Sequence, residues 1–153
     1  MSWFSLLEQG LIDQEYLQGR MSLAFNQCAS DLGNGPLVEA LSRGRYNTYY
    51  GCGALMQLVV GHAVDEEDAA AGLFRFWAEL IRRGQQNEAQ TYTTDEYFQL
   101  MLEFEVPASV RTWIDAIRLE QLDNPASFLT PPLQAAGWLV EPGENGYRLS
   151  LSQ

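Results

Sequence analysis

Apolar residues recur at the spacing of an amphipathic helix along most of the chain, and capping or breaking residues separate the segments. Asp13 precedes the first long segment and is a suitable N-cap. Thr93 and Glu96 have the spacing of a capping box, and Pro107 can occupy the first turn of a further helix. The pattern predicts a mostly α protein with a bundle of about six helices.

Turn-forming and polar stretches set the expected limits of these helices. Residues 31–36 close the first helix, residues 43–45 follow a short helix that begins at Pro36, and residues 85–90 form a polar loop. The acidic residues 65–68 are expected to form the capped first turn of a helix that ends at Gly84. Thr130 is expected to cap one or two helical turns that end at Gly137.

The segment Tyr46 to Ala63 leaves almost no polar face, so we expect a central, buried helix there. It contains three glycines, Gly51, Gly53 and Gly61, and each costs about 0.5–1 kcal/mol relative to alanine inside a helix. A close approach of another backbone at Gly53 would explain its presence. We therefore predict such a contact at this position.

The C-terminal end carries the strand-like material of the chain. Residues 138–141 and 147–151 are rich in strand-forming residues and flank a turn-forming stretch, which predicts a β-hairpin. We expect a helical domain over residues 1–137, with the hairpin of residues 138–153 packed on it. At 153 residues the whole chain has the length of a single domain.

Charge and cysteine content restrict the partners and the compartment. Nine arginines and no lysine stand against 20 acidic residues, and the resulting net charge of −11 argues against nucleic acid or an anionic membrane as a partner. No long apolar run or signal peptide is evident, so we expect a cytoplasmic protein. Cys28 and Cys52 match no metal or redox spacing and are expected to be small buried hydrophobic residues in a reducing compartment.

The residue types available limit the chemistry. His62 is the only histidine, which excludes the H-E-x-x-H zinc motif and any mechanism that needs two histidines. The acidic run at residues 65–68 lacks the alternating ligands and central glycine of a calcium loop. We therefore expect no bound metal and no cofactor.

Four segments, in this order and spacing, resemble the glycyl aminopeptidase family of zinc metallopeptidases, which belongs to the thermolysin-like clan. They are Gly10–Leu17, Tyr49–Leu55, Gly72–Trp77 and Tyr92–Phe98. The resemblance covers about residues 10–137 and implies the helical lobe that follows the zinc site in that family. The zinc-binding half, which lies upstream in the family, is missing from this chain.

In the family, a Tyr-Tyr-x-Lys-Gly-Ala segment opens a buried helix, and the tyrosine three residues before the glycine stabilises the oxyanion. The resemblance assigns this role to Tyr50, with Gly53 as the glycine and Cys52 in place of the lysine. A tyrosine hydroxyl without zinc cannot hydrolyse a peptide at a useful rate. The alternative role for Tyr50 is that of a packed aromatic at the head of a helix.

The resemblance thus implies a peptidase-like helical domain without its own zinc centre, which is not an enzyme as an isolated chain and binds a peptide or a protein. Two alternatives stay open. The chain could be the C-terminal part of an active zinc aminopeptidase whose metal site lies on missing residues or another chain, or an unrelated structural or oligomerisation module.

The candidate site residues are Tyr50, as the oxyanion-stabilising group, and Tyr46, Tyr49 and Gly53 for binding. In the family this side of the lobe forms one wall of the substrate cleft. Removal of the other lobe should expose the aromatic groups. A partner, a second copy of the chain or the N-terminal segment with Trp3 and Phe4 could cover them, and we favour a homodimer or the N-terminal segment over an open groove.

Overall fold

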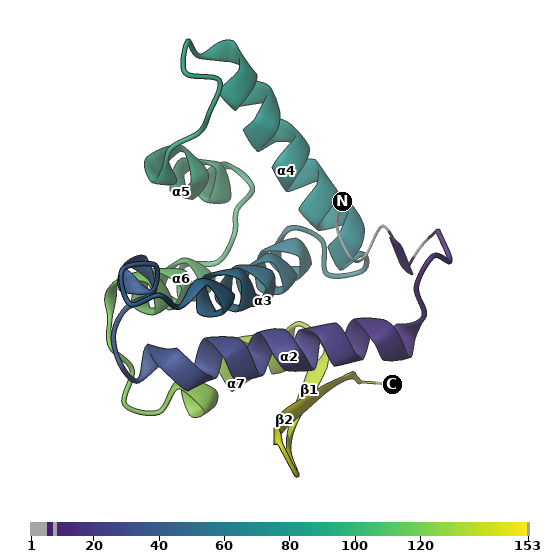
Figure 1. Cartoon of the computed structure of the whole chain (residues 1–153). Helices are drawn as coiled ribbons and strands as arrows, with labels where there is room; N and C mark the ends of the chain where they lie inside the picture. Colours follow the sequence, from purple (N-terminus) through teal and green to yellow (C-terminus); the bar gives the residue numbers. More distant parts are fainter. Residues whose placement is uncertain (1–5, 8, 153) are drawn as a thin grey trace.

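The computed structural model describes residues 6, 7 and 9–152 and shows a mostly helical protein with a C-terminal two-stranded hairpin (Figure 1). The elements are, in order, α2 (Gln14–Leu32), the 3₁₀ helix η1 (Leu37–Glu39), α3 (Tyr46–Val64), α4 (Ala69–Gln86), α5 (Thr94–Glu103), α6 (Ala108–Leu119), α7 (Pro125–Ala135), β1 (Trp138–Gly143) and β2 (Gly146–Leu151). The predicted mostly helical class, with about six helices, and the C-terminal hairpin are confirmed. Among the described helices, none is long and apolar enough to cross a membrane.

Two of the predicted helix caps are present. The Asp13 Oδ1 atom accepts a hydrogen bond from the Tyr16 backbone N–H at 2.7 Å and caps α2. The capping box before α5 is complete, because Thr93 Oγ1 accepts from the Glu96 N–H and the Glu96 carboxylate accepts from the Thr93 N–H. These local signals fix the starts of α2 and α5 independently of tertiary packing.

The start of α4 differs from the prediction. Asp68 is the N-cap and accepts from the Ala71 N–H at 2.9 Å, so the helix begins at Ala69. Asp65 accepts from the N–H groups of Glu67 and Asp68, at 3.2 and 3.0 Å, and shapes a turn before the helix. The prediction that residues 65–68 form the first turn of the helix was therefore wrong. An aspartate side chain can accept hydrogen bonds from the backbone N–H groups that follow it in a turn as well as from those at the start of a helix.

The start of α7 also differs. Asn124 caps the helix by accepting from the Ser127 N–H at 3.2 Å, and Pro125 occupies its first turn. Thr130 is inside the helix, where its hydroxyl donates to the Ala126 carbonyl at 2.7 Å. The prediction placed the cap at Thr130 and was wrong, because Asn124–Pro125 carries the same cap-and-proline signal one and a half turns earlier.

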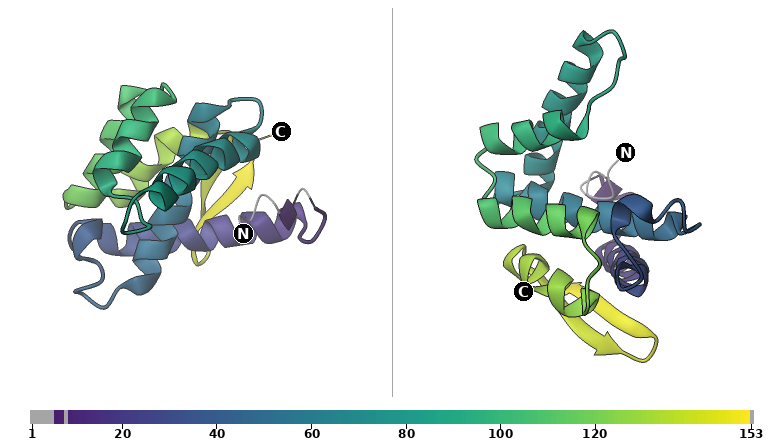
Figure 2. Two further views of the ribbon diagram at one scale, coloured as in Figure 1. Left: turned by 90° about the horizontal axis from the view of Figure 1, so that it is seen from above. Right: turned by 90° about the vertical axis from the view of Figure 1, so that its left-hand side faces the viewer.

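Helix α3 is the centre of the fold, as predicted. It packs against α2 on one side and α4 on another, and it also contacts α6 and α7 (Figure 2). Its side chains at Leu55, Leu58, Val59 and Val60 are buried in the core. The N-terminal turns of α3 do reach solvent, because their tyrosines are exposed.

The glycines of α3 have different surroundings. A methyl group at Gly51 would lie 2.6 Å from the Ala24 carbonyl oxygen of α2, and one at Gly61 would lie 2.5 Å from the Ala69 carbonyl oxygen of α4. A methyl group at Gly53 would have no neighbouring atom within 4 Å. The predicted close approach at Gly53 is wrong, since the close contacts fall at Gly51 and Gly61.

Cys28 of α2 and Cys52 of α3 form a disulfide across the contact between these two helices, and both residues are fully buried. Their predicted burial is confirmed, whereas the prediction that they are free is wrong, because packing of α2 on α3 joins positions 24 residues apart in sequence. Disulfides are unusual in the cytoplasm. The cytoplasmic location stays a prediction, and this bond does not favour it.

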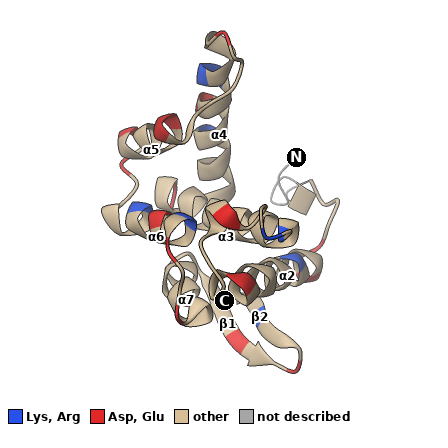
Figure 3. Ribbon diagram, turned by 60° about the vertical axis from the view of Figure 1, so that its left-hand side comes forward, with Lys and Arg blue, Asp and Glu red and all other residues tan. Residues whose placement is uncertain are grey.

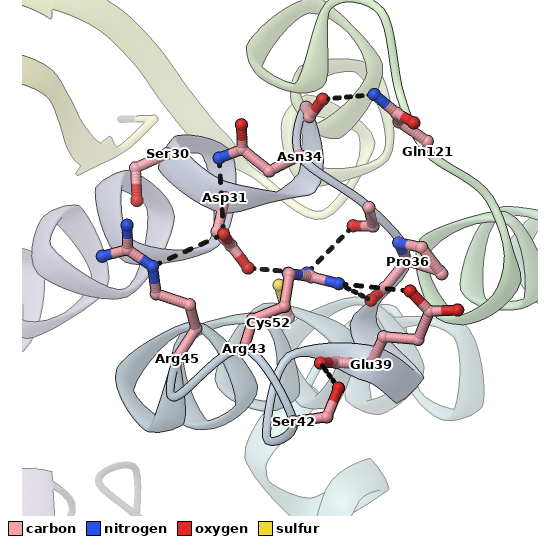
Figure 4. A network of polar contacts seen from close by, with 12 residues as sticks. Ser30, Asp31, Asn34, Pro36, Glu39, Ser42, Arg43, Arg45, Cys52 and Gln121 are labelled. Atoms are coloured by element: carbon pink, nitrogen blue, oxygen red, sulfur yellow. Dashed lines mark hydrogen bonds and ion pairs between the residues drawn. The ribbon is translucent and has the colours of Figure 1, made fainter.

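A polar network lies beside the disulfide and joins the end of α2 to the loop before α3 (Figure 4). The buried Asp31 carboxylate accepts from Arg43 Nη2 at 2.7 Å and lies 3.7 Å from Arg45 Nε. Arg43 also donates to the carbonyl oxygens of Gly35 and Pro36, at 3.2 Å each. The network holds the loop that leads into Tyr46 at the start of α3.

The hairpin is antiparallel, with Trp138 opposite Leu151 and Gly143 opposite Gly146. It packs on α2 through polar contacts as well as apolar ones. The Asn26 side chain accepts from the Tyr147 N–H at 2.8 Å and donates to the Tyr147 carbonyl at 2.7 Å. These bonds satisfy backbone groups of Tyr147 in β2 and fix the hairpin against α2.

Candidate ligand groove

A groove of about 380 Å³ opens where α3, α4, α5 and α6 face one another. Figure 1 shows α4 rising steeply from α3, with α5 alongside its outer half and α6 beside α3. The described lining of the groove is mainly aromatic and apolar. It consists of Leu37, Val38, Tyr49, Gly53, Met56, Gln57, Trp77, Tyr92, Thr94, Tyr97, Phe98, Ile114 and Arg118.

One face of α3 forms the floor of the groove. Tyr49, Gly53, Met56 and Gln57 follow one another at helical spacing and all line it. Gly53 has no side chain, and the space that its Cβ would occupy is open. The floor is therefore hollowed at Gly53, between Tyr49 on one side and Gln57 on the other.

Aromatic rings from three segments form the opposite wall. Trp77 belongs to α4, Tyr92 to the loop before α5, and Tyr97 to α5. The Trp77 and Tyr92 ring centres are 5.7 Å apart with an interplanar angle of 70°, and those of Trp77 and Tyr97 are 6.5 Å apart at 57°. Rings at such angles pack with the edge of one toward the face of another.

A hydrogen bond to Gln57 fixes the Trp77 part of this wall. Trp77 Nε1–H donates to Gln57 Oε1 at 2.6 Å. Burial raises the pKa of the Tyr97 phenol, and the nearby Tyr92 raises it further. Burial, with a smaller effect of Tyr49, also raises the pKa of Tyr92. These two phenols are thus neutral at physiological pH, and the rings form a preset, uncharged wall.

The positively charged side chain of Arg118, on α6, lies at the edge of the groove. Arg118 lies over the Phe98 ring, with its guanidinium carbon 5.2 Å from the ring centre, and donates to Asp115 at 2.7 Å. Among the described lining residues, the only formal charge is that of Arg118. Its pairing with Asp115 leaves the interior of the groove without an uncompensated positive charge.

An ion-pair cluster joins α4 to α5. Arg83 pairs with Glu103 of α5 at 2.5 Å and with Glu79 of α4 at 2.7 Å. Glu79 also accepts two hydrogen bonds from Arg82, and the bonds from Arg82 and then Arg83 lower its pKa to about 2. Because α4 and α5 each carry part of the aromatic wall, this cluster helps to set the width of the groove.

The structure brings together two of the four predicted site residues. Tyr49 and Gly53 line the groove, whereas Tyr50 projects into solvent with 73% of its surface exposed. Tyr46 is also exposed and borders a separate, more open hollow with Gln27. Among the described residues, no group of three His, Cys, Asp or Glu side chains is placed to hold a metal ion. Trp3 and Phe4, the expected cover, lie outside the described residues.

Sequence reasoning missed the other groove residues. Trp77 and Tyr97 belong to the apolar stripes of their helices, and the periodicity that predicted those stripes does not separate a core position from a groove wall. A usable signal was the polar atom that each carries, since tyrosine and tryptophan favour partly exposed positions.

Comparison of the chain with protein-family models, curated proteins and solved structures finds no match. The resemblance to glycyl aminopeptidases therefore stays a prediction.

Proposed function

We propose that this chain is a non-catalytic binding domain that accepts a segment of a peptide or protein in the groove between α3, α4, α5 and α6. The observation that carries the proposal is the open hollow at Gly53 opposite a hydrogen-bonded aromatic wall. A cavity that is already shaped avoids part of the ordering cost of binding.

The size and lining of the groove suit side chains of a peptide. Its volume of about 380 Å³ lies at the lower end of ordinary ligand pockets. Tyr49 is 47% exposed and Tyr92 is 39% exposed, and partly exposed aromatic rings of this kind are enriched among residues that dominate binding energy. Such rings give contact area at a small entropic cost, because they have few rotatable bonds.

The resemblance to the helical lobe of glycyl aminopeptidases is part of this proposal. In that family the corresponding side of the lobe forms one wall of the substrate cleft, so a domain that lacks the zinc half would retain a peptide-facing surface. Tyr49 and Gly53, which the resemblance assigns to this surface, line the groove.

Selection of random peptides on the chain tests the proposal. A phage-displayed library is panned on the immobilised protein, with Gly53→Phe, which fills the groove, for counter-selection and Gly53→Ala, which leaves most of it open, as the matched control. We expect peptides that bind the wild type and Gly53→Ala but not Gly53→Phe. Failure to enrich any sequence, or equal binding to all three proteins, would refute it. Circular dichroism spectra of both variants should match that of the wild type, and melting curves should show that both are folded at the temperature of the selection.

The exposed position of Tyr50 favours one alternative, in which the chain completes a zinc aminopeptidase with residues from elsewhere. Elemental analysis and an aminoacyl-anilide assay on protein purified from its native source test this alternative. Zinc bound in a one-to-one ratio, with turnover that Tyr50→Phe removes, would support the enzyme over the binding domain.

A homodimer in which a second copy covers the groove would appear as a doubled mass in sedimentation. Gly53→Phe should then reduce the fraction of dimer.

A further inference from the structure

We infer that the groove takes a cationic side chain, an arginine or lysine of a basic peptide, against the rings of Tyr49, Trp77 and Tyr92. This inference rests on the proposed function and names the chemistry of its ligand. The three rings come from α3, α4 and the loop before α5, so the fold rather than local sequence gathers them.

The arrangement of the rings fits a cation. The planes of Trp77 and Tyr92 meet at 70°, and Tyr49 lines the same groove from α3. A positive group is attracted to the face of an aromatic ring within about 6 Å of its centre, and tryptophan gives the strongest attraction. Because the Trp77 N–H is bonded to Gln57, the indole cannot turn freely, and its orientation is set before a ligand arrives.

The charge of the protein is complementary to such a ligand. The chain has a net charge of −11 and no lysine, and the described groove lining has no cation other than Arg118. Arg118 is already paired with Asp115 and stacked on Phe98. Figure 3 shows acidic residues on α5, whereas α6 carries both basic and acidic ones. An anionic peptide would meet repulsion here, whereas a basic one would be attracted.

The other lining residues indicate which side chains would flank the basic residue in the peptide. Val38 and Met56 offer apolar surface beside the rings, and Val38 is 53% exposed. Leucines on either side of a basic residue could cover these groups while the long stem of arginine or lysine packs on the indole. The recognised element is thus a basic residue between apolar ones.

Four peptides of the form acetyl-Ser-Leu-X-Leu-Ser-amide test the inference, with X as arginine, lysine, norleucine or glutamate. Their dissociation constants are measured by calorimetry at physiological ionic strength. We expect the arginine and lysine peptides to bind about tenfold more tightly than the norleucine peptide, and the glutamate peptide to bind most weakly. Trp77→Leu should remove the preference for a cation. Phe74→Leu, at an exposed position of the same helix outside the groove, should retain it.

The other outcomes of these binding measurements distinguish failure of this inference from failure of the proposed function. Equal binding of the arginine and norleucine peptides, lost in Gly53→Phe, would overturn the cation preference and leave the peptide groove intact. A preference that survives Trp77→Leu would reflect general attraction to an acidic surface and would also overturn it. Absence of binding by all four peptides would refute this inference, whereas the library selection decides the proposed function separately.

Discussion

Gly51→Ala and Gly53→Ala add the same methyl group to α3, two residues apart, and should change stability in opposite directions. At Gly53 the methyl group meets no atom within 4 Å, so the variant should gain the helix propensity of alanine, about 0.5–1 kcal/mol. At Gly51 it would lie 2.6 Å from the Ala24 carbonyl oxygen and 3.0 Å from Gln27 Cβ. These distances are too short for the methyl group to fit, so α2 or α3 must shift in Gly51→Ala.

The movement at Gly51 is costly because both helices are fixed nearby. The disulfide joins Cys28 to Cys52, the residue next to Gly51, so α2 cannot easily retreat from α3. Overpacking of a well-packed contact costs about 1–3 kcal/mol, and the gain in propensity offsets less than 1 kcal/mol of this. We expect Gly51→Ala to lose about 1–2 kcal/mol, which places the two variants about 2 kcal/mol apart.

Urea unfolding followed by circular dichroism measures the difference. With a slope of about 2 kcal/mol per molar urea, the midpoints of the two variants should differ by about 1 M. Equal midpoints, or a loss at Gly53 greater than that at Gly51, would refute the assignment of the close contact to Gly51 and of the open space to Gly53. The same result would remove the structural basis of the groove floor.

Three further predictions concern the bonds around the groove and the core. Replacement of Cys28 and Cys52 by serine should cost about 3 kcal/mol in urea unfolding, because the disulfide closes a loop over a separation of 24 residues. Asp31→Asn should cost about 1.5–3 kcal/mol in the same assay, because it weakens the 2.7 Å bond from Arg43 at a buried position. The pKa of Glu79 is lowered from 4.5 to about 2, so its stabilising effect is present above 4.5 and disappears as pH falls toward 2. The wild type should therefore lose more thermal stability than Glu79→Gln over that range, and parallel losses would contradict this.

Local signals made much of the fold predictable. The cap at Asp13 and the capping box at Thr93 act within one turn of helix, and the structure confirms both. The hairpin followed from strand-forming residues around a short turn. The cap of α7 was placed at the wrong position because Asn124–Pro125 and Thr130–Pro131 carry equivalent signals, and only the packed fold selects between them.

The groove was only partly predictable because contacts between helices create it. The resemblance pointed to Tyr49 and Gly53, but no periodicity shows that Gly53 faces open space while Gly51 meets another backbone. The disulfide was missed for the same reason, since pairing of Cys28 with Cys52 depends on how α2 packs against α3. Tyr92 lies outside any helix, and the position of its ring beside Trp77 depends on the turn between α4 and α5.

The central claim is that the groove over Gly53 is the ligand site, and nuclear Overhauser effects between a library-selected peptide and the protein test it most directly. The account predicts contacts from one peptide side chain to the rings of Tyr49, Trp77 and Tyr92, and their disappearance in Gly53→Phe. Contacts confined to Tyr46 and Tyr50, or to the hairpin, would contradict it.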